Sequence, residues 1–315
     1  MKIIILGDLH FSGTNPKCRL DDLTQTQFLK LDEVVDYANK YRMNIYQTGD
    51  VFDSPNIGYS IFTRVHSILR RLKHNSFYFI YGNHDLYFHN PNSKGSTPLY
   101  SLQTITKSIE NIVESSINFD FQNWGEEIKI VNFYSKFLLC HKAIVSSGYY
   151  KKEKTIQHWN PTDISCSSLD EELKKYKVIF CGHWHKRYIE KTKNQLIINP
   201  GSLTRREASQ DSLETFPSFI VFDTQTYDYD IVPLKCAKKA EVVISEKHLE
   251  LTKAKRSMTK SIEDFMENLK KKGTINKRSF LDKLNKFVET ELNDYETELF
   301  QEIIASTVGV KNNEE

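Results

Sequence analysis

Short apolar runs alternate with helical patterns along the first eighty residues of the chain. The runs predict strands at residues 1–6, 44–48 and 76–80, because an uninterrupted run of about five apolar residues is typical of a buried strand. Between them, apolar residues recur at helical spacing over residues 24–41 and 60–72, which predicts two amphipathic helices. This strand–helix–strand order favours parallel strands joined by helical crossovers.

From residue 95 onward the pattern favours short strands and few helices. Short helices are expected at residues 99–106 and 169–176, and the polar stretch 146–163 is expected to be a long loop of the kind that often covers a site. The chain up to residue 240 is therefore expected to form one mixed α/β (α+β) domain. Its further strands are predicted at 119–124, 127–133, 137–140, 178–181, 195–198, 218–222 and 229–234.

Residues 241–315 are predicted to form a separate helical region. The composition shifts to charged residues, and the run 270–273, which ends in glycine, is expected to separate two helices. Their apolar stripes must be buried, either against the chain's own domain, against each other or against a partner protein. The stripes are formed by Ile262, Phe265, Met266 and Leu269, by Phe280, Leu281, Leu284, Phe287 and Val288, and by Leu299, Phe300, Ile303 and Ile304.

Charge and composition limit the classes of protein that fit. The formal net charge is +2, so bulk electrostatics do not indicate nucleic-acid binding, and any basic surface has to be local. No apolar segment is long enough to cross a membrane, and the first one is too short for a signal peptide. The five cysteines are scattered and form no CxxC pair, which favours a reducing compartment. We therefore expect a cytoplasmic protein without a membrane partner.

Side chains of the kinds that bind metals follow five of the predicted strands. In α/β sheets the carboxyl ends of strands meet at one edge, where ligands usually bind. Any one of these groups alone is more typical of a turn or a surface, but five in succession favour a metal site. The candidate ligands are Asp8, His10, Asp50, Asn83, His141, His183 and His185.

The donor types narrow the chemistry of this candidate site. Carboxylate and imidazole donors without sulfur suit Mn²⁺, Fe²⁺ or Zn²⁺ better than Ca²⁺ or a structural zinc. Seven ligands are too many for one tetrahedral ion, and they fit two ions, roughly 3.5–4 Å apart, that share a carboxylate and hold a phosphate. His84, next to Asn83, would then be free to donate a proton to the leaving oxygen. Asp53 has two interpretations, a cap for the helix that follows or a catalytic residue that orients His84.

The same residues resemble the motif set of the calcineurin-like metallophosphoesterases. The resemblance covers about residues 1–238 and implies a two-layer β-sandwich flanked by helices. It implies two divalent ions, with Mn²⁺ expected, and His84 as a catalytic residue that is not a ligand. One ion would be held by Asp8, His10, Asp50 and His185, and the other by Asp50, Asn83, His141 and His183. The matching motifs are Asp8-x-His10, Gly49-Asp50-x-x-Asp53, Gly82-Asn83-His84-Asp85, His141 after a strand, and Gly182-His183-x-His185.

Within that superfamily the chain is most similar to SbcD-like DNA-repair nucleases, including phage versions. The form of the second motif and the run 199–206 carry this similarity. It implies a DNA nuclease, with exonuclease or single-strand endonuclease activity or both, in DNA repair, recombination or phage DNA metabolism. It also implies a coiled-coil SbcC-like ATPase partner held by the C-terminal region, and a homodimer is a further expectation.

Five basic residues near the motifs have two interpretations, contacts to DNA phosphates or ordinary solvated side chains. Two other functions also stay open. One is hydrolysis of small phosphodiesters or phosphomonoesters, and the other is a non-catalytic scaffold whose metal site supports a partner. The complete ligand set and His84 argue against the scaffold. The basic residues are Lys142, Lys186, Arg187, Arg205 and Arg206.

Overall fold

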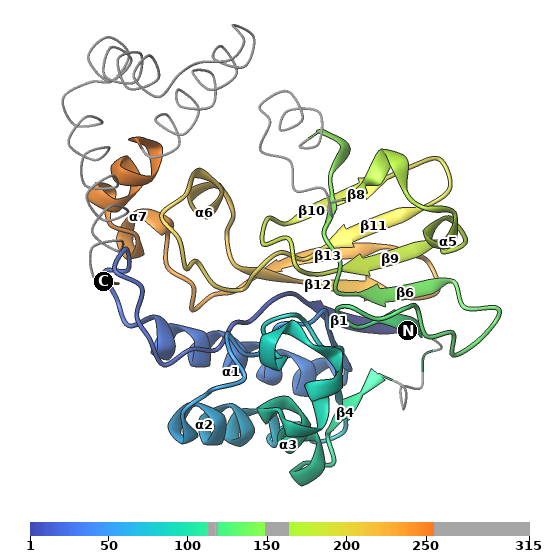
Figure 1. The fold of residues 1–315 in the computed structure, drawn as a ribbon, viewed down its shortest axis with the longest axis horizontal. Coiled ribbons are helices and arrows are strands. Elements are labelled where there is room, and N and C mark those ends of the chain that lie inside the picture. Colours follow the sequence, from blue (N-terminus) through green and yellow to red (C-terminus); the bar gives the residue numbers. More distant parts are fainter. Residues whose placement is uncertain (113–116, 118, 149–163, 255–315) are drawn as a thin grey trace, which may run out of the picture. The chain divides into compact units, whose positions relative to one another are not determined.

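Two β-sheets packed face to face form the body of residues 1–245 (Figure 1). The computed structural model describes residues 1–112, 117, 119–148 and 164–254. The chain divides into two compact units, residues 1–245 and 246–315. Of the second unit only residues 246–254 are described, and they are mainly helical. The predicted apolar stripes between residues 262 and 304, and most of the predicted loop 146–163, lie outside the described residues.

The larger sheet has six strands in the order β13-β12-β1-β2-β3-β4. Strands β1 to β4 run parallel, whereas β12 is antiparallel to β1 and β13 is antiparallel to β12. Helices α1 (Leu23–Tyr41), α2 (Tyr59–Leu69) and α3 (Pro98–Ile105) cover its outer face (Figure 1). The strands are β1 (Lys2–Leu6), β2 (Ile45–Gln47), β3 (Phe77–Phe79), β4 (Ile109–Asn111), β12 (Ser218–Asp223) and β13 (Tyr229–Pro233).

The smaller sheet has five strands in the order β10-β11-β9-β6-β5, all parallel except β10. The residues on its far side include buried Leu169 and Leu173, close to the short helix α5 (Glu171–Lys174). Its strands are β5 (Phe119–Gln122), β6 (Phe137–Cys140), β9 (Val178–Cys181), β10 (Tyr188–Lys191) and β11 (Leu196–Asn199).

The remaining described elements lie outside the two sheets. They are the strand pair β7 (Ile144–Val145) and β8 (Ile164–Ser165), the helices α6 (Gln210–Glu214) and α7 (Ala240–Val243), and 3-10 turns at Tyr87–His89, Pro91–Ser96 and Cys166–Ser168.

Strand β1 is buried on both of its faces. Ile3 and Ile5 pack between the two sheets, whereas Ile4 and Leu6 belong to the core beneath the helices. Successive side chains of a strand point to opposite faces, so a strand covered on both sides is an uninterrupted apolar run. Each fully buried side chain of this size contributes about 1.5–3 kcal/mol to the free energy of unfolding.

Local sequence determines where α1 begins and ends. The Asp22 carboxylate accepts a hydrogen bond from the Gln25 N–H at 3.0 Å, which satisfies a free donor of the first turn. At the other end Arg42 adopts a left-handed φ of 52° and its N–H donates to the Ala38 carbonyl. The observed helix, Leu23–Tyr41, begins one residue before the predicted range.

The expected mixed α/β class and the two sheets flanked by helices are confirmed. The strand predicted at residues 127–133 is wrong, because this segment forms only an isolated bridge between Lys129 and Phe121. Ile130 and Val131 are exposed there, so their apolar character does not reflect a buried face. Strands β4 and β10 were not predicted, because edge strands carry polar residues and lack the continuous apolar run of central ones.

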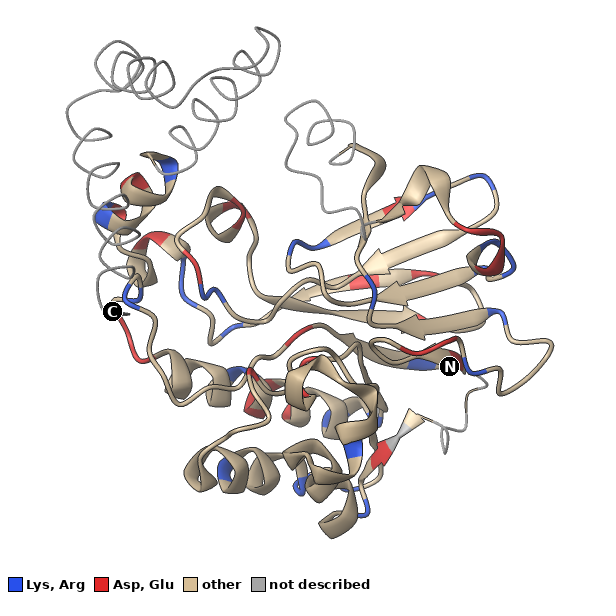
Figure 2. Cartoon of the chain, in the orientation of Figure 1, with Lys and Arg blue, Asp and Glu red and all other residues tan. Residues whose placement is uncertain are grey.

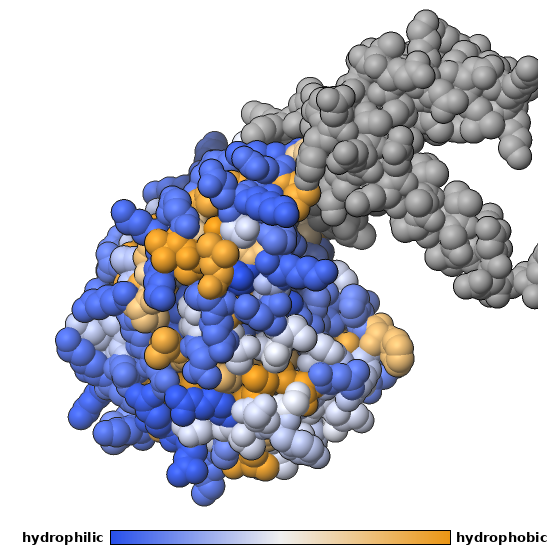
Figure 3. Space-filling view, turned by 90° about the vertical axis from the view of Figure 1, so that its left-hand side faces the viewer, coloured by the Kyte–Doolittle hydropathy of each residue, from blue (hydrophilic) through white to orange (hydrophobic). Residues whose placement is uncertain are grey.

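The surface of the described chain is polar and mixed in charge. The face in Figure 3 is mainly hydrophilic, with apolar residues in small separate groups. Lysine and arginine alternate with aspartate and glutamate over helices, strands and loops (Figure 2), in keeping with the net charge of +2. Among the residues that the structure describes, no helix is both long and apolar enough to span a bilayer.

Candidate metal centre

Five loops at one edge of the two sheets bring the candidate ligands together. Three follow β1, β2 and β3 of the larger sheet, and two follow β6 and β9 of the smaller one. The strands within each of these two sets run parallel, so their carboxyl ends lie on the same side. The first loops carry Asp8, His10, Asp50 and Asn83, and the others carry His141, His183 and His185.

One group consists of Asp8, His10 and His185, whose donor atoms lie within 4.8 Å of one another. The Nε2 atoms of His10 and His185 are 2.9 Å apart, and His185 Nε2 is 3.5 Å from Asp8 Oδ2. Asp8 and His10 are buried, whereas the His185 side chain is 51% exposed. This group is therefore open to solvent on the His185 side.

The second group consists of Asp50, His141 and His183, also within 4.8 Å of one another. Asn83 joins it, because its Oδ1 lies 3.1 Å from His141 Nε2 and 3.0 Å from His183 Nδ1. The indole of Trp124 stacks on the ring of His183 with centroids 4.8 Å apart. This group thus offers a carboxylate, an amide oxygen and two imidazoles to one point.

Asp50 lies between the two groups. Its Oδ2 is 3.3 Å from His141 Nε2 in the second group and 3.7 Å from His10 Nε2 in the first. One carboxylate oxygen therefore faces both sets of donors, which is one arrangement that would let two ions share a carboxylate.

Burial determines the protonation state of two of the imidazoles. Loss of water lowers the pKa of His10 to about 3 and of His183 to about 4. These rings are neutral at pH 7 and have a lone pair for a cation. Burial also opposes the charged form of His141, but the negative charge of Asp50 outweighs it and raises the pKa to about 9. A cation bound at this group would take the place of that proton.

The ligand loops have an unusual backbone. His10, Asp50 and His183 have left-handed φ angles of 46°, 58° and 75°. This conformation costs residues with a Cβ atom about 1–2 kcal/mol and is common at functional sites. Two motif glycines are required by close approach, since a Cβ at Gly82 would lie 2.1 Å from Asp50 Oδ1 and one at Gly49 would lie 2.3 Å from His141 Nδ1.

The donor set fits divalent cations. Carboxylates, an amide oxygen and neutral imidazoles without cysteine suit Mn²⁺, Fe²⁺ or Zn²⁺. The Nδ1 atom of His10 is buried and forms no hydrogen bond with the described residues, although Asp53 Oδ1 lies 3.4 Å from it. The two facing Nε2 atoms of His10 and His185 lie at a distance that neutral rings tolerate only if one of them donates a hydrogen. A cation bound between the two rings would accept both lone pairs, so neither ring would need to donate a hydrogen to the other. The assignment of four ligands to each ion stays a prediction.

Several residues that the sequence analysis did not single out hold the ligands in place. The Asp85 carboxylate accepts hydrogen bonds from the N–H groups of Asp50, Phe52 and Gly82 at 2.9–3.0 Å. Gln27 of α1 donates to the carbonyls of Leu9 and His10, at 3.1 and 2.6 Å. Asp85 lies in a matched motif, which is a signal in the sequence. Gln27 gave none, because it looks like any polar residue of an amphipathic helix.

His84 lies beside the ligands, in a third group with His10 and Asp53. Its Nδ1 is 2.9 Å from the Asp53 carbonyl oxygen and 3.9 Å from the carboxylate, so the main chain of Asp53 orients the ring. The Asp53 carboxylate is instead paired with Arg206, whose Nη2 donates to Oδ2 at 2.7 Å. The interpretation of Asp53 as a helix cap is wrong, because α2 begins after Gly58 and has no side-chain cap.

The five predicted phosphate contacts differ in their surroundings. Arg205 is buried and donates to the carbonyls of Thr215 and Lys238. Arg187 likewise donates to the Phe216 carbonyl and the Ser218 hydroxyl. These two arginines thus support the fold. Arg206 lies at the edge of the site through Asp53, while Lys186 pairs with Asp211 and Lys142 lies 3.9 Å from Asp170.

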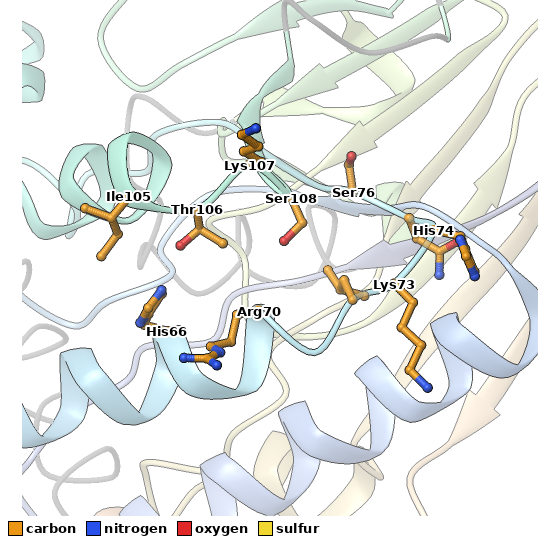
Figure 4. Close-up of a pocket in the computed structure, with 11 residues that line it drawn as sticks. His66, Arg70, Lys73, His74, Ser76, Ile105, Thr106, Lys107 and Ser108 are labelled. Carbon is orange, nitrogen blue, oxygen red and sulfur yellow. The ribbon is translucent and has the colours of Figure 1, made fainter.

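The described residues form several hollows outside the two donor groups. One of about 300 Å³ is bordered by His84, loop 53–56 and segment 86–89. Another, of about 630 Å³, is shown in Figure 4, where His66 and Arg70 at the end of α2 face Thr106 after α3. It is lined by basic residues and no acidic one, but it adjoins the amino ends of β3 and β4. Extended chain of about 3.3 Å per residue separates Ser76 from Asn83 by roughly 20 Å, so this hollow is not part of the metal centre.

A family model supports the interpretation of this site. The model of the calcineurin-like phosphoesterase superfamily domain matches residues 1–227. No curated protein matches the chain significantly.

Solved structures with a similar fold are distant. An archaeal phosphodiesterase is 16% identical, with a TM-score of 0.39 over 74% of this chain and 100% of that one. A putative 5′-nucleotidase from Staphylococcus aureus is 12% identical, with a TM-score of 0.43 over 80% and 57%. Zinc-bound Vps29 from Entamoeba histolytica is 16% identical, with a TM-score of 0.32 over 75% and 100%. The family match, and not these similarities, carries the assignment.

We expect Asp50→Asn to lower occupancy of both metal sites, because one Asp50 oxygen faces both donor groups. His10→Ala should chiefly lower occupancy of the site formed with Asp8 and His185. Elemental analysis after dialysis against Mn²⁺ measures the metal per chain, with wild-type protein as the reference. Equal loss of a single ion in both variants would contradict the shared carboxylate.

Arg205→Ala should destabilise the fold by about 2–4 kcal/mol, because it removes a buried side chain and leaves the partly buried carbonyls of Thr215 and Lys238 without their charged donor. Arg64→Ala is the matched control; that side chain is 53% exposed and 3.6 Å from Asp32, so its loss should cost less than about 1 kcal/mol. Urea unfolding of both variants measures the difference. Equal free energies of unfolding would show that Arg205 has no structural role.

Proposed function

The chain belongs to the calcineurin-like phosphoesterase superfamily, and we propose that it is a nuclease that hydrolyses phosphodiester bonds of DNA with two divalent ions, Mn²⁺ being the expected metal. The observation that carries the proposal is the position of Asp50 between two donor groups, with His84 beside them. Such an arrangement suits a phosphate held across two cations. A single structural ion needs neither a shared carboxylate nor an adjacent histidine.

The proposed reaction follows from where a phosphate would lie, between the two donor groups and His84. Divalent ions, when bound, would neutralise the phosphate charge and make a water molecule more acidic. The water oxygen bonds to phosphorus, the bond from phosphorus to the leaving oxygen breaks, and that oxygen takes up a proton. The Asp53 carbonyl can only accept, so His84 Nδ1 carries a hydrogen towards it. Nε2 gives a proton to the leaving oxygen from the doubly protonated ring, which is left neutral with its hydrogen on Nδ1. The proton released by the attacking water goes to solvent, from which His84 takes up its next proton.

The exposure of the site supports a polymeric substrate. The side chains of His84 and His185 are 39% and 51% exposed, so a strand can reach the centre without being enclosed. A second candidate is hydrolysis of small phosphate esters. The hollow of about 300 Å³ beside His84 favours it, because this volume is at the lower end for small-ligand pockets. A scaffold without activity is the least supported, since it would have no use for His84.

The C-terminal region is the proposed partner-binding part of the chain. Its apolar stripes at helical spacing support binding to the coiled coil of an SbcC-like ATPase, by an apolar helix face laid in a groove. A homodimer stays a prediction.

We expect the purified protein with Mn²⁺ to cut single-stranded DNA and blunt duplex DNA. His84→Ala should lower the turnover roughly 10²–10⁴-fold, the usual contribution of a general acid, while it keeps both ions. Gel assays of the two DNA substrates and a small phosphodiester, beside elemental analysis, test this. Turnover of the small ester alone would favour the second candidate, and no turnover with any divalent ion would refute the enzyme. Loss of both ions from His84→Ala would make that residue a ligand.

Truncation after residue 244 should leave metal binding and cleavage of single-stranded DNA intact, because every proposed ligand precedes residue 186. Binding to an SbcC-like ATPase and ATP-dependent processing of duplex DNA should be lost. A pull-down with full-length and truncated chains, run beside the nuclease assay, compares them. Undiminished binding by the truncated chain would place the partner surface on the first unit instead.

A further inference from the structure

The side chain of Phe88 is 98% exposed at the border of the hollow beside His84. A single exposed apolar residue is ordinary on a protein surface and carries no argument by itself. The position and the backbone of Phe88 are what distinguish it. It lies four residues after His84 and lines the same hollow, so a group that fills the hollow can contact both the ring and the histidine.

The backbone holds Phe88 in this position at a cost. Phe88 has φ 52° and ψ 29°, and His89 has φ 55°, so two successive residues with a Cβ are left-handed. Residues of this kind persist only where their surroundings determine the conformation. Here the Tyr87 N–H donates to Ser93 Oγ at 3.0 Å, and Leu86 on the other side is fully packed in the core. The ring is therefore presented to solvent by an anchored segment.

The surroundings of the ring combine flat and polar groups. The imidazoles of His84 and His89 lie 6.1 Å apart by their centroids. Asn56 and Ser54 also line the hollow and supply polar groups, and its volume is about 300 Å³. A planar heterocycle with hydrogen-bonding edges suits such a site, because every nucleobase offers an aromatic face for stacking and polar edges for amide and hydroxyl groups.

We propose that this hollow binds a nucleobase, and that Phe88 stacks on the base of the nucleotide on the leaving side of the scissile phosphate. The inference rests on the proposed function, because the leaving side is defined by the proton that His84 gives to the leaving oxygen. Stacking tolerates any base, so the subsite favours nucleotides over other phosphate esters without selecting a sequence.

Two dinucleotides test the subsite. They differ only in the leaving-side unit, which carries adenine in one and an abasic tetrahydrofuran in the other. Wild-type protein with Mn²⁺ should show a kcat/KM about tenfold higher for the base-bearing substrate, within the range of one base–aromatic stack. Phe88→Ala should bring the ratio towards one, and Phe88→Trp should keep it.

Phe133→Ala is the matched control. Phe133 is 92% exposed, but it precedes β6, whose carboxyl end leads to the metal centre, so it lies toward the other edge of the sheet. Its removal should leave the ratio of the two substrates unchanged. If Phe133→Ala lowered the ratio of kcat/KM for the two substrates as much as Phe88→Ala does, the effect would belong to exposed aromatic residues in general. That result would overturn the subsite.

A binding measurement separates this inference from the proposed function. Saturation-transfer NMR with deoxyadenosine and the metal-free protein should show transfer to the base protons, and Phe88→Ala should abolish most of it. Without any turnover by the wild type, the proposed function fails while this measurement still decides the subsite. Turnover with the same substrate ratio in wild type and Phe88→Ala, or equal transfer to the base protons in both, would refute the subsite.

Discussion

The Asp85 carboxylate ties the loops after β2 and β3 into one unit. It accepts the main-chain N–H groups of Asp50 and Phe52 from one loop and of Gly82 from the other. Asp85 is fully buried, so these bonds are shielded from water and their donors would be costly to leave unpaired. The position of the Asp50 side chain, and with it the link between the two donor groups, depends on this attachment.

The rest of the site follows from packing around that unit. Gly49 and Gly82 allow the loops to approach the side chains of His141 and Asp50 more closely than a Cβ would permit. Three ligand residues have a left-handed backbone, which costs free energy. Packing of the surrounding core offsets this cost. The same burial removes water from the rings of His10 and His183 and keeps them neutral. The same close packing therefore sets both the positions of the ligands and the protonation of the buried imidazoles.

The residues around the metal centre limit how it can contact a substrate. Two of the five basic residues near the motifs, Arg187 and Arg205, donate to main-chain carbonyls and so serve the fold itself. Substrate contacts therefore have to come from fewer cations and from the exposed edge at His84 and His185. An aromatic ring at that edge offers a base a contact that charge does not provide. This fits a chain with a net charge of only +2.

The sequence by itself determined the class of fold and the set of metal-type side chains. Buried parallel strands are continuous apolar runs, and the residues that follow them meet at one edge, so both could be predicted from local pattern. Tertiary structure decided which polar residues serve the fold and which face the site. Asp53 and Arg206, which are 153 positions apart, form an ion pair that no local pattern contains. The exposed segment at 130–131 and the bent backbone at Phe88 were likewise decided by neighbours in space, because exposure depends on what packs against a residue and not on its own identity.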